Sequence, residues 1–144
     1  MKESQYSHVT VLFRQMTSIW RKQFNQVSQE LDLTPLDRMI LVTLFFEPDC
    51  RSKSELAETL KLESQSLTRS LKRLEKKGFI LRKKSMEDQR SVLHSLTNEG
   101  QKLVNILGSE ADKLWAFLLK DCPTEDLQGF LKVMMHCIRR VNNI

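Results

Sequence analysis

The sequence predicts a mostly α-helical fold with one small two-stranded β-hairpin. Apolar residues recur every three or four positions through most of the 144-residue chain, which is the spacing of amphipathic helices. Only four Gly and three Pro are present, too few turn-forming residues for an all-β fold. Residues 79–84 and 90–96 differ from the rest, because they read as two strands around a polar turn.

Composition limits the class of protein. A hydrophobic content of 40% is enough to build a single core in one domain of this size. No apolar run approaches the roughly 18 residues of a membrane span, and the first residues lack an apolar signal segment. We therefore expect a cytoplasmic protein. Cys50, Cys122 and Cys137 form no CxxC pair, so we expect neither a disulfide framework nor a zinc finger, and no cofactor or metal.

The first long helix is predicted over residues 3–31. Its apolar residues step by threes and fours from Val9 to Leu31. A helix of this length spans about 40 Å, which is more than a small core covers. Part of the apolar stripe is therefore expected to pack against a second subunit.

Two start signals follow. Thr34, Pro35 and Asp37 predict a helix that runs to about Phe46, and its apolar residues on nearly all sides predict a buried position. The sequence from Ser52 to Glu55 forms a capping box that opens a short helix ending near Leu60.

A second short helix is predicted from Ser64 to Gly78. Three leucines, at 67, 71 and 74, form its apolar stripe, and polar and cationic residues occupy the other side. Glu63 or Ser64 is expected to cap its start, and Gly78 to end it in a left-handed conformation. Two short helices joined by a tight turn, the second one basic outside, make a helix-turn-helix. The hairpin that follows is then a wing.

Positive charge is concentrated in this middle third. Residues 51–97 hold 12 Lys and Arg against 6 Asp and Glu, a net charge of +6 within a chain of net charge +5. Such a basic block beside a helix-turn-helix predicts a polyanion partner, double-stranded DNA. Short polar groups and Arg suit base edges, and Lys and Arg suit phosphates. The predicted DNA-binding residues are Ser52, Ser64, Gln65, Ser66, Thr68, Arg69, Lys72, Arg73, Lys76, Arg82, Lys83, Lys84, Asp88 and Arg90.

Arg90 is the most distinctive of these residues. Asp88, two residues before it, is predicted to hold the Arg90 guanidinium in a fixed orientation. An ordinary surface ion pair is the alternative.

Two further helices are predicted, over residues 97–120 and 123–141. Each carries an apolar stripe, and together with the first helix they supply material for dimerisation. One domain over residues 1–144 is therefore predicted, with a winged helix-turn-helix part over about 33–97 and a helical dimerisation part over about 3–31 and 98–144.

Five short sequence segments, found in this order, resemble the MarR (multiple antibiotic resistance regulator) family of bacterial and archaeal winged-helix regulators. They are Glu55-Leu56-Ala57, Leu67-Thr68-Arg69, the run from Leu74 to Ile80 followed by Arg82, Asp88-Gln89-Arg90, and the run from Leu96 to Gly100. Leu33-Thr34, before the predicted buried helix, adds to the resemblance. The resemblance covers essentially the whole chain.

The resemblance implies a homodimeric transcription regulator, a repressor or an activator, that binds a pseudo-palindromic operator. It also implies control by small aromatic anions or by thiol oxidation. Residues 3–31 contain no cysteine, unlike the peroxide-sensing members, and His8, His94 and His136 are too dispersed for the zinc-sensing type.

Other candidates remain open. Phe13, Met16, Trp20 and Arg38 could line an effector pocket, although core packing is the favoured interpretation. His94 could contact phosphate or respond to pH, although a solvated strand residue is favoured.

The three cysteines are also open. A functional thiol at Cys50 or Cys122 is the less favoured alternative, and Cys137 is expected in the core.

A protein-interaction module and an enzyme are the two alternative classes of function. A winged-helix protein-interaction module would not need the basic block. An enzyme would need a nucleophile, a base and an orienting group, or a metal cluster, and the sequence offers none at plausible spacing.

Overall fold

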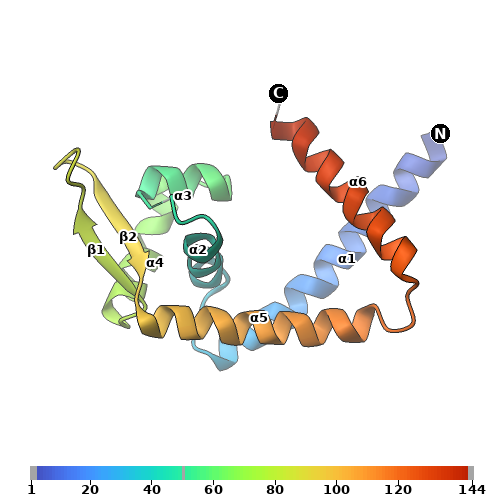
Figure 1. Ribbon diagram of the computed structural model, residues 1–144, viewed down its shortest axis with the longest axis horizontal. Coiled ribbons are helices and arrows are strands. Elements are labelled where there is room, and N and C mark those ends of the chain that lie inside the picture. The colour runs from blue at the N-terminus through green and yellow to red at the C-terminus, as the bar shows by residue number, and fades with distance from the viewer. Residues whose placement is uncertain (1–2, 50, 143–144) are drawn as a thin grey trace. The chain divides into compact units, whose positions relative to one another are not determined.

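The structure, a computed structural model, describes residues 3–49 and 51–142. The chain divides within α5 into two compact units, residues 1–110 and 111–144. The elements, labelled in Figure 1, are α1 (Glu3–Glu30), α2 (Pro35–Phe46), α3 (Lys53–Leu60), α4 (Ser64–Lys76), β1 (Ile80–Lys84), β2 (Val92–Leu96), α5 (Asn98–Leu118) and α6 (Thr124–Asn142). The predicted mostly α-helical fold with one hairpin is confirmed.

Local capping explains where α2 and α3 begin. The Thr34 N–H donates to Asp37 Oδ2 at 2.9 Å, and Thr34 Oγ1 accepts from the Asp37 N–H at 3.1 Å. Ser52 and Glu55 make the same reciprocal pair at 2.8 and 3.1 Å. Both predicted starts are confirmed. The side-chain cap predicted at the start of α4 is wrong, because Glu63 is the N-cap residue and makes no capping hydrogen bond.

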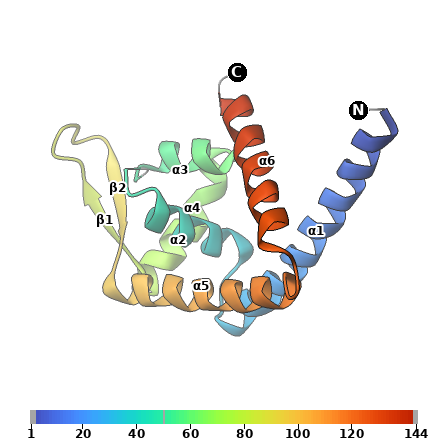
Figure 2. The same ribbon diagram turned by 45° about the vertical axis from the view of Figure 1, so that its right-hand side comes forward.

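The core of the first unit surrounds α2. Ile40 and Leu41 are completely buried, and α2 contacts α1, α3, α4 and β2 (Figure 2). Met39, Phe45 and Phe46 are exposed, so α2 is less enclosed than its composition predicts. The core residues are Leu33, Ile40, Leu41, Leu44, Leu56, Ala57, Leu67, Leu71, Leu74, Ile80, Leu103, Val104 and Leu107.

The hairpin follows α4 directly. Gly78 has φ +77°, the left-handed conformation predicted for the end of this helix. β1 and β2 are antiparallel, and Arg82 lies opposite His94. The Thr97 N–H donates to Phe79 O at 3.0 Å, which joins the base of the hairpin to the start of α5.

The long helices leave much apolar surface uncovered in the single chain. On α1, Val9, Leu12 and Phe13 are 57%, 50% and 52% exposed. This agrees with the expectation that the core of its own unit buries only part of the apolar stripe of α1. No helix in the described part of the chain combines the length and apolar character needed to cross a membrane.

The second unit contains the rest of α5 and α6. Phe130, Ile138 and Val141 are exposed on α6. Cys137 is exposed as well, so its predicted core position is wrong for the single chain. Cys122 is exposed just before α6, and Cys50 lies outside the described residues.

Candidate nucleic-acid interface

Helix α4 has one buried face and one exposed cationic face. Leu67, Leu71 and Leu74 are 0%, 5% and 0% exposed and belong to the core. An exposed row of side chains runs along the helix at positions 65, 69, 72 and 76, where consecutive members are three or four residues apart. This row contains Gln65, Arg69, Lys72 and Lys76. The leucines therefore fix the helix while the row remains available to a partner.

Arg73 has a different role from the one the sequence predicts. Its Nε and Nη2 atoms donate to Asp37 Oδ2 and Oδ1 at 3.0 and 2.7 Å, a bidentate ion pair. Its Nη2 also donates to Thr34 Oγ1 at 3.1 Å and to Ser70 Oγ at 3.2 Å. Because the half-buried guanidinium already binds Asp37, Arg73 anchors α4 to α2, and we leave it out of the proposed DNA contacts.

Electrostatics supports this anchor. Asp37 is 0% exposed. Burial alone would raise its pKa, but hydrogen bonds from Arg73 and from the Thr34 backbone outweigh that effect and hold the pKa of Asp37 below its ordinary value. The carboxylate is therefore charged when it meets Arg73.

A second ion pair lies one turn further along the chain, just past the end of α4. Lys77 Nζ donates to Asp32 Oδ2 at 2.7 Å and also to the Asp32 carbonyl oxygen. The hydrogen bond from Lys77 lowers the pKa of Asp32. Two cations four residues apart thus fasten the C-terminal end of α4 to the corner between α1 and α2.

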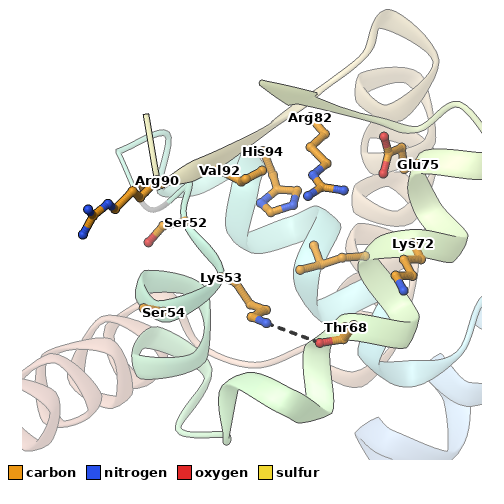
Figure 3. Close-up of a pocket in the computed structure, with 12 residues that line it drawn as sticks. Ser52, Lys53, Ser54, Thr68, Lys72, Glu75, Arg82, Arg90, Val92 and His94 are labelled. Carbon is orange, nitrogen blue, oxygen red and sulfur yellow. Dashed lines mark hydrogen bonds between the residues drawn. The ribbon is translucent and has the colours of Figure 1, made fainter. Parts of the chain in front are cut away.

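A cavity of about 380 Å³ opens between α3, α4 and the hairpin (Figure 3). Its lining includes four cations, Lys53, Lys72, Arg82 and Arg90, and one carboxylate, Glu75. Such a hollow suits an anion, because four cationic side chains line one concave surface.

Lys53 and Ser54 line this cavity but were not predicted as site residues. Lys53 is the first residue of α3, and its Nζ lies 3.5 Å from Thr68 Oγ1 in the next helix. The capping box at Ser52 identifies Lys53 as the first residue of a helix. The contact of Lys53 with α4 depends on how the two helices pack, which no short sequence pattern around Lys53 indicates.

The hairpin presents its cations on two faces. Side chains alternate along a strand, so Arg82 and Lys84 share one face and Lys83 lies on the other. Arg82 lines the cavity, and all three side chains are exposed. The hairpin therefore offers positive charge both toward α4 and away from it.

Asp88 shapes the turn instead of holding the Arg90 guanidinium. Its Oδ1 accepts the Arg90 backbone N–H at 3.0 Å, and its own N–H donates to Ser85 Oγ at 3.3 Å. The predicted contact between this carboxylate and the Arg90 side chain is corrected accordingly. The Arg90 side chain is exposed and lines the cavity.

The other predicted residues either line this cavity or are exposed elsewhere on α4 and the hairpin. Ser52, Thr68, Lys72, Arg82 and Arg90 line the cavity. Gln65, Ser66, Arg69, Lys76, Lys83 and Lys84 are exposed, and Ser64 is half-buried at the start of α4. Ser52 Oγ accepts the Glu55 N–H, so this hydroxyl is also part of a helix cap.

His94 is not the solvated residue that the sequence favoured. It is 6% exposed, and its backbone N–H donates to Arg51 O at 2.9 Å. Its ring Nδ1 lies 3.0 Å from the same carbonyl oxygen. The cross-strand position opposite Arg82 turns it toward the cavity, which it lines.

The predicted effector residues are partly brought together. Arg38 lies 4.9 Å from the centroid of the Phe24 ring, and Phe24 lies 4.4 Å from Trp20, centroid to centroid. Burial lowers the pKa of Arg38, and its Nη1 is a buried donor that has no hydrogen-bond partner among residues 3–49 and 51–142. Phe13 and Met16 are 52% and 36% exposed. Phe24 was not among the predicted effector residues, although it continues the apolar stripe of α1 beyond Trp20.

The described residues contain no group of three or more His, Cys, Asp or Glu side chains arranged to hold a metal ion.

Comparison with known proteins gives a consistent picture. A model of the MarR family matches residues 33–92. The uncharacterised HTH-type transcriptional regulator YdgJ of Bacillus subtilis is 30% identical over 107 residues, covering 74% of this chain. The organic hydroperoxide resistance transcriptional regulator of the same organism is 38% identical over 100 residues, covering 67% of this chain. The matched part spans 65% of the length of each relative.

Solved structures share the fold at low sequence identity. A MarR family protein from Bacillus stearothermophilus superposes with a TM-score of 0.87 at 17% identity, covering 99% of both chains. The S. aureus MepR–DNA complex matches with a TM-score of 0.74 at 22% identity, covering 92% of this chain and 97% of that one.

Proposed function

The chain belongs to the MarR family, and from this premise we propose that it is a sequence-specific regulator of transcription that binds double-stranded DNA. The observation that carries the proposal is the exposed cationic row of α4 beside a cavity lined by Lys53, Lys72, Arg82 and Arg90. Both B. subtilis relatives are transcriptional regulators by name, and MepR has been solved with DNA. We assign the chain no catalytic step and place its action in the cytoplasm, on the nucleoid.

The chemistry of the side chains separates those that contact bases from those that contact the DNA backbone. The first turns of α4 carry Ser64, Gln65, Ser66, Thr68 and Arg69, which have the donors and acceptors needed to read base edges in a major groove. The remaining cations suit the DNA backbone or the neighbouring minor groove. These are Lys72, Lys76, Arg82, Lys83, Lys84 and Arg90.

Selection from fragmented genomic DNA tests the function. The purified protein should enrich a limited set of duplexes, and its affinity for them should fall steeply as salt concentration rises. Enrichment of no sequence, together with an affinity that is insensitive to salt, would point to the alternative of a protein-interaction module.

Arg69→Ala and Arg90→Ala should each weaken binding to a selected duplex by more than about tenfold, since a good contact of this kind contributes about 1–3 kcal/mol. Thermal stability should stay the same, because both side chains are exposed. Fluorescence anisotropy titrations measure the affinity. Lys120→Ala, which also removes one exposed positive charge, is the control and should change little. Unchanged affinity in both arginine variants would refute their assigned roles.

We propose that two copies bind a pseudo-palindromic operator, as a repressor or an activator. The support is the apolar surface that α1 and α6 leave exposed in the single chain. Sedimentation at micromolar concentration should give the mass of a dimer. A monomer mass under these conditions would contradict the proposal.

We also propose that a small aromatic anion regulates binding near Trp20 and Arg38, with Phe13 and Met16 at its edge. The partnerless Arg38 Nη1 offers a hydrogen bond to a carboxylate. Benzoate-type anions should release the selected duplex from the native protein but not from Arg38→Gln. Equal release from both proteins would count against this site.

A further inference from the structure

His94 is held at one edge of its ring. The backbone N–H and ring Nδ1 both lie within hydrogen-bond distance of the Arg51 carbonyl oxygen, at 2.9 and 3.0 Å. A carbonyl oxygen can only accept, so Nδ1 carries a hydrogen. In the neutral ring, Nε2 then has the free lone pair.

The other edge of the ring belongs to the cationic cavity. Figure 3 shows the imidazole turned into the cavity beside Arg82, which is its cross-strand partner. The charged groups around the cavity come from α3, α4, β1 and the turn between the strands. They are Lys53 of α3, Lys72 and Glu75 of α4, Arg82 of β1 and Arg90 of the turn, with Arg51 on the far side of the ring.

Because of these neighbouring charges, whether His94 is protonated depends on whether an anion occupies the cavity. A proton on Nε2 adds a fifth positive charge to a lining that has one carboxylate. A phosphate oxygen in the cavity offsets this repulsion and supplies the acceptor that Nε2–H lacks. Histidine is the side-chain type whose charge ordinarily changes between about pH 5 and pH 8, so DNA binding measured across this range tests the coupling.

We propose that His94 takes up a proton when the protein binds DNA and donates Nε2–H to a backbone phosphate in the cavity, so that DNA affinity rises as pH falls. The inference rests on the proposed DNA-binding function. The proton comes from solvent and is returned on release, and no covalent bond changes. Because the bound state holds one more proton than the free state, acid favours the bound state.

Two substitutions separate the roles of the two ring nitrogens. His94→Asn keeps an amide donor near the position of Nδ1 and should preserve the bond to Arg51 O, but it has no donor at the cavity. His94→Gln places a permanently neutral amide near the position of Nε2. His136→Gln is the control, because it removes an exposed imidazole of α6 that does not line the cavity. Circular dichroism establishes that each variant is folded.

The experiment measures affinity for a selected duplex of about 30 base pairs at about pH 6 and pH 8, at constant ionic strength. One proton taken up across this range can change affinity by up to about 100-fold, and we expect about tenfold for the native protein and for His136→Gln. His94→Asn and His94→Gln should be nearly insensitive to pH, and His94→Gln should bind the more tightly of the two at pH 8. If His94→Asn fails to fold, His94→Gln alone decides the question.

Calorimetry in two buffers with different ionisation heats gives a second readout. The native protein should take up a fraction of a proton on binding at pH 7, and His94→Gln should take up less. An equal pH response or equal proton uptake in native and variant proteins overturns the role of His94 and leaves DNA binding intact. No DNA binding at either pH overturns the proposed function as well.

Discussion

Asp37→Asn is expected to lower the free energy of unfolding by about 2 to 3 kcal/mol. The native carboxylate is fully buried, accepts two hydrogen bonds from Arg73 and forms half of the capping box of α2. The new amide at position 37 keeps one acceptor oxygen, but its NH2 group then faces the N–H donors of the Arg73 guanidinium. Because the Arg73 side chain is 31% exposed, water can hydrate part of its charge and limit the loss. Chemical denaturation measures the loss.

Asp32→Asn is the matched control. Asp32 pairs with Lys77 at the same 2.7 Å separation, but its side chain is 94% exposed. Exposed ion pairs contribute little, and Asn tolerates the left-handed backbone at this position, where φ is 53°. Little change in the free energy of unfolding is therefore expected. Similar losses in the two variants would show that burial of Asp37 does not set the strength of its pair.

The same ion pair predicts a response to acid. The pKa of Asp37 in the folded protein lies below its ordinary value, because the hydrogen bonds from Arg73 and Thr34 outweigh the effect of burial. Its contribution is therefore present at neutral pH and is lost as pH falls below about 4, through the folded pKa. Over that range Asp37→Asn should lose less stability than the native protein.

Gly100→Ala is expected to cost about 3 kcal/mol or more, the upper range for overpacking. A Cβ at this position would lie 2.1 Å from Phe79 O and 3.3 Å from Leu96 Cδ2. The nearest atom belongs to the backbone at the base of the hairpin, so the clash cannot be relieved by a side-chain rotation. The start of α5 and the hairpin must separate, and DNA affinity should fall with stability.

Gly108→Ala is the control within the same helix. Apart from the adjacent backbone of α5, a Cβ there meets no atom of the described residues within 4 Å, so the substitution should raise helix stability by up to about 1 kcal/mol. Thermal unfolding of both variants gives the comparison. A Gly100→Ala protein as stable as the native one would show that α5 and the hairpin can shift apart freely.

The sequence predicted the elements well because their signals are local. Thr34 with Asp37 and Ser52 with Glu55 are three residues apart, and each pair defines a helix start by itself. The leucine stripe of α4 likewise identifies its buried face.

The site was predicted less completely, since its corrections involve contacts between distant residues. Arg73 looks like part of the outer cationic face on a helical projection, but its partner is a buried carboxylate 36 residues earlier. A period of two indicates which strand residues share a face but not which face is covered, so His94 could not be identified as buried.

The two attachments of α4 have a mechanical consequence. Arg73 and Lys77 attach one end of α4 to the corner between α1 and α2, whereas the side chains that we propose read the bases lie at the opposite end. Helix α4 has 13 residues and is about 20 Å long. A tilt of about 10° about its attached C-terminal end would therefore move its N-terminal end by about 3 Å. A displacement of this size is larger than the range of donor–acceptor distances in a hydrogen bond, so hydrogen bonds from this end of the helix to a base would break. A slight rotation at the α1–α2 corner would thus suffice to disengage the helix from a groove.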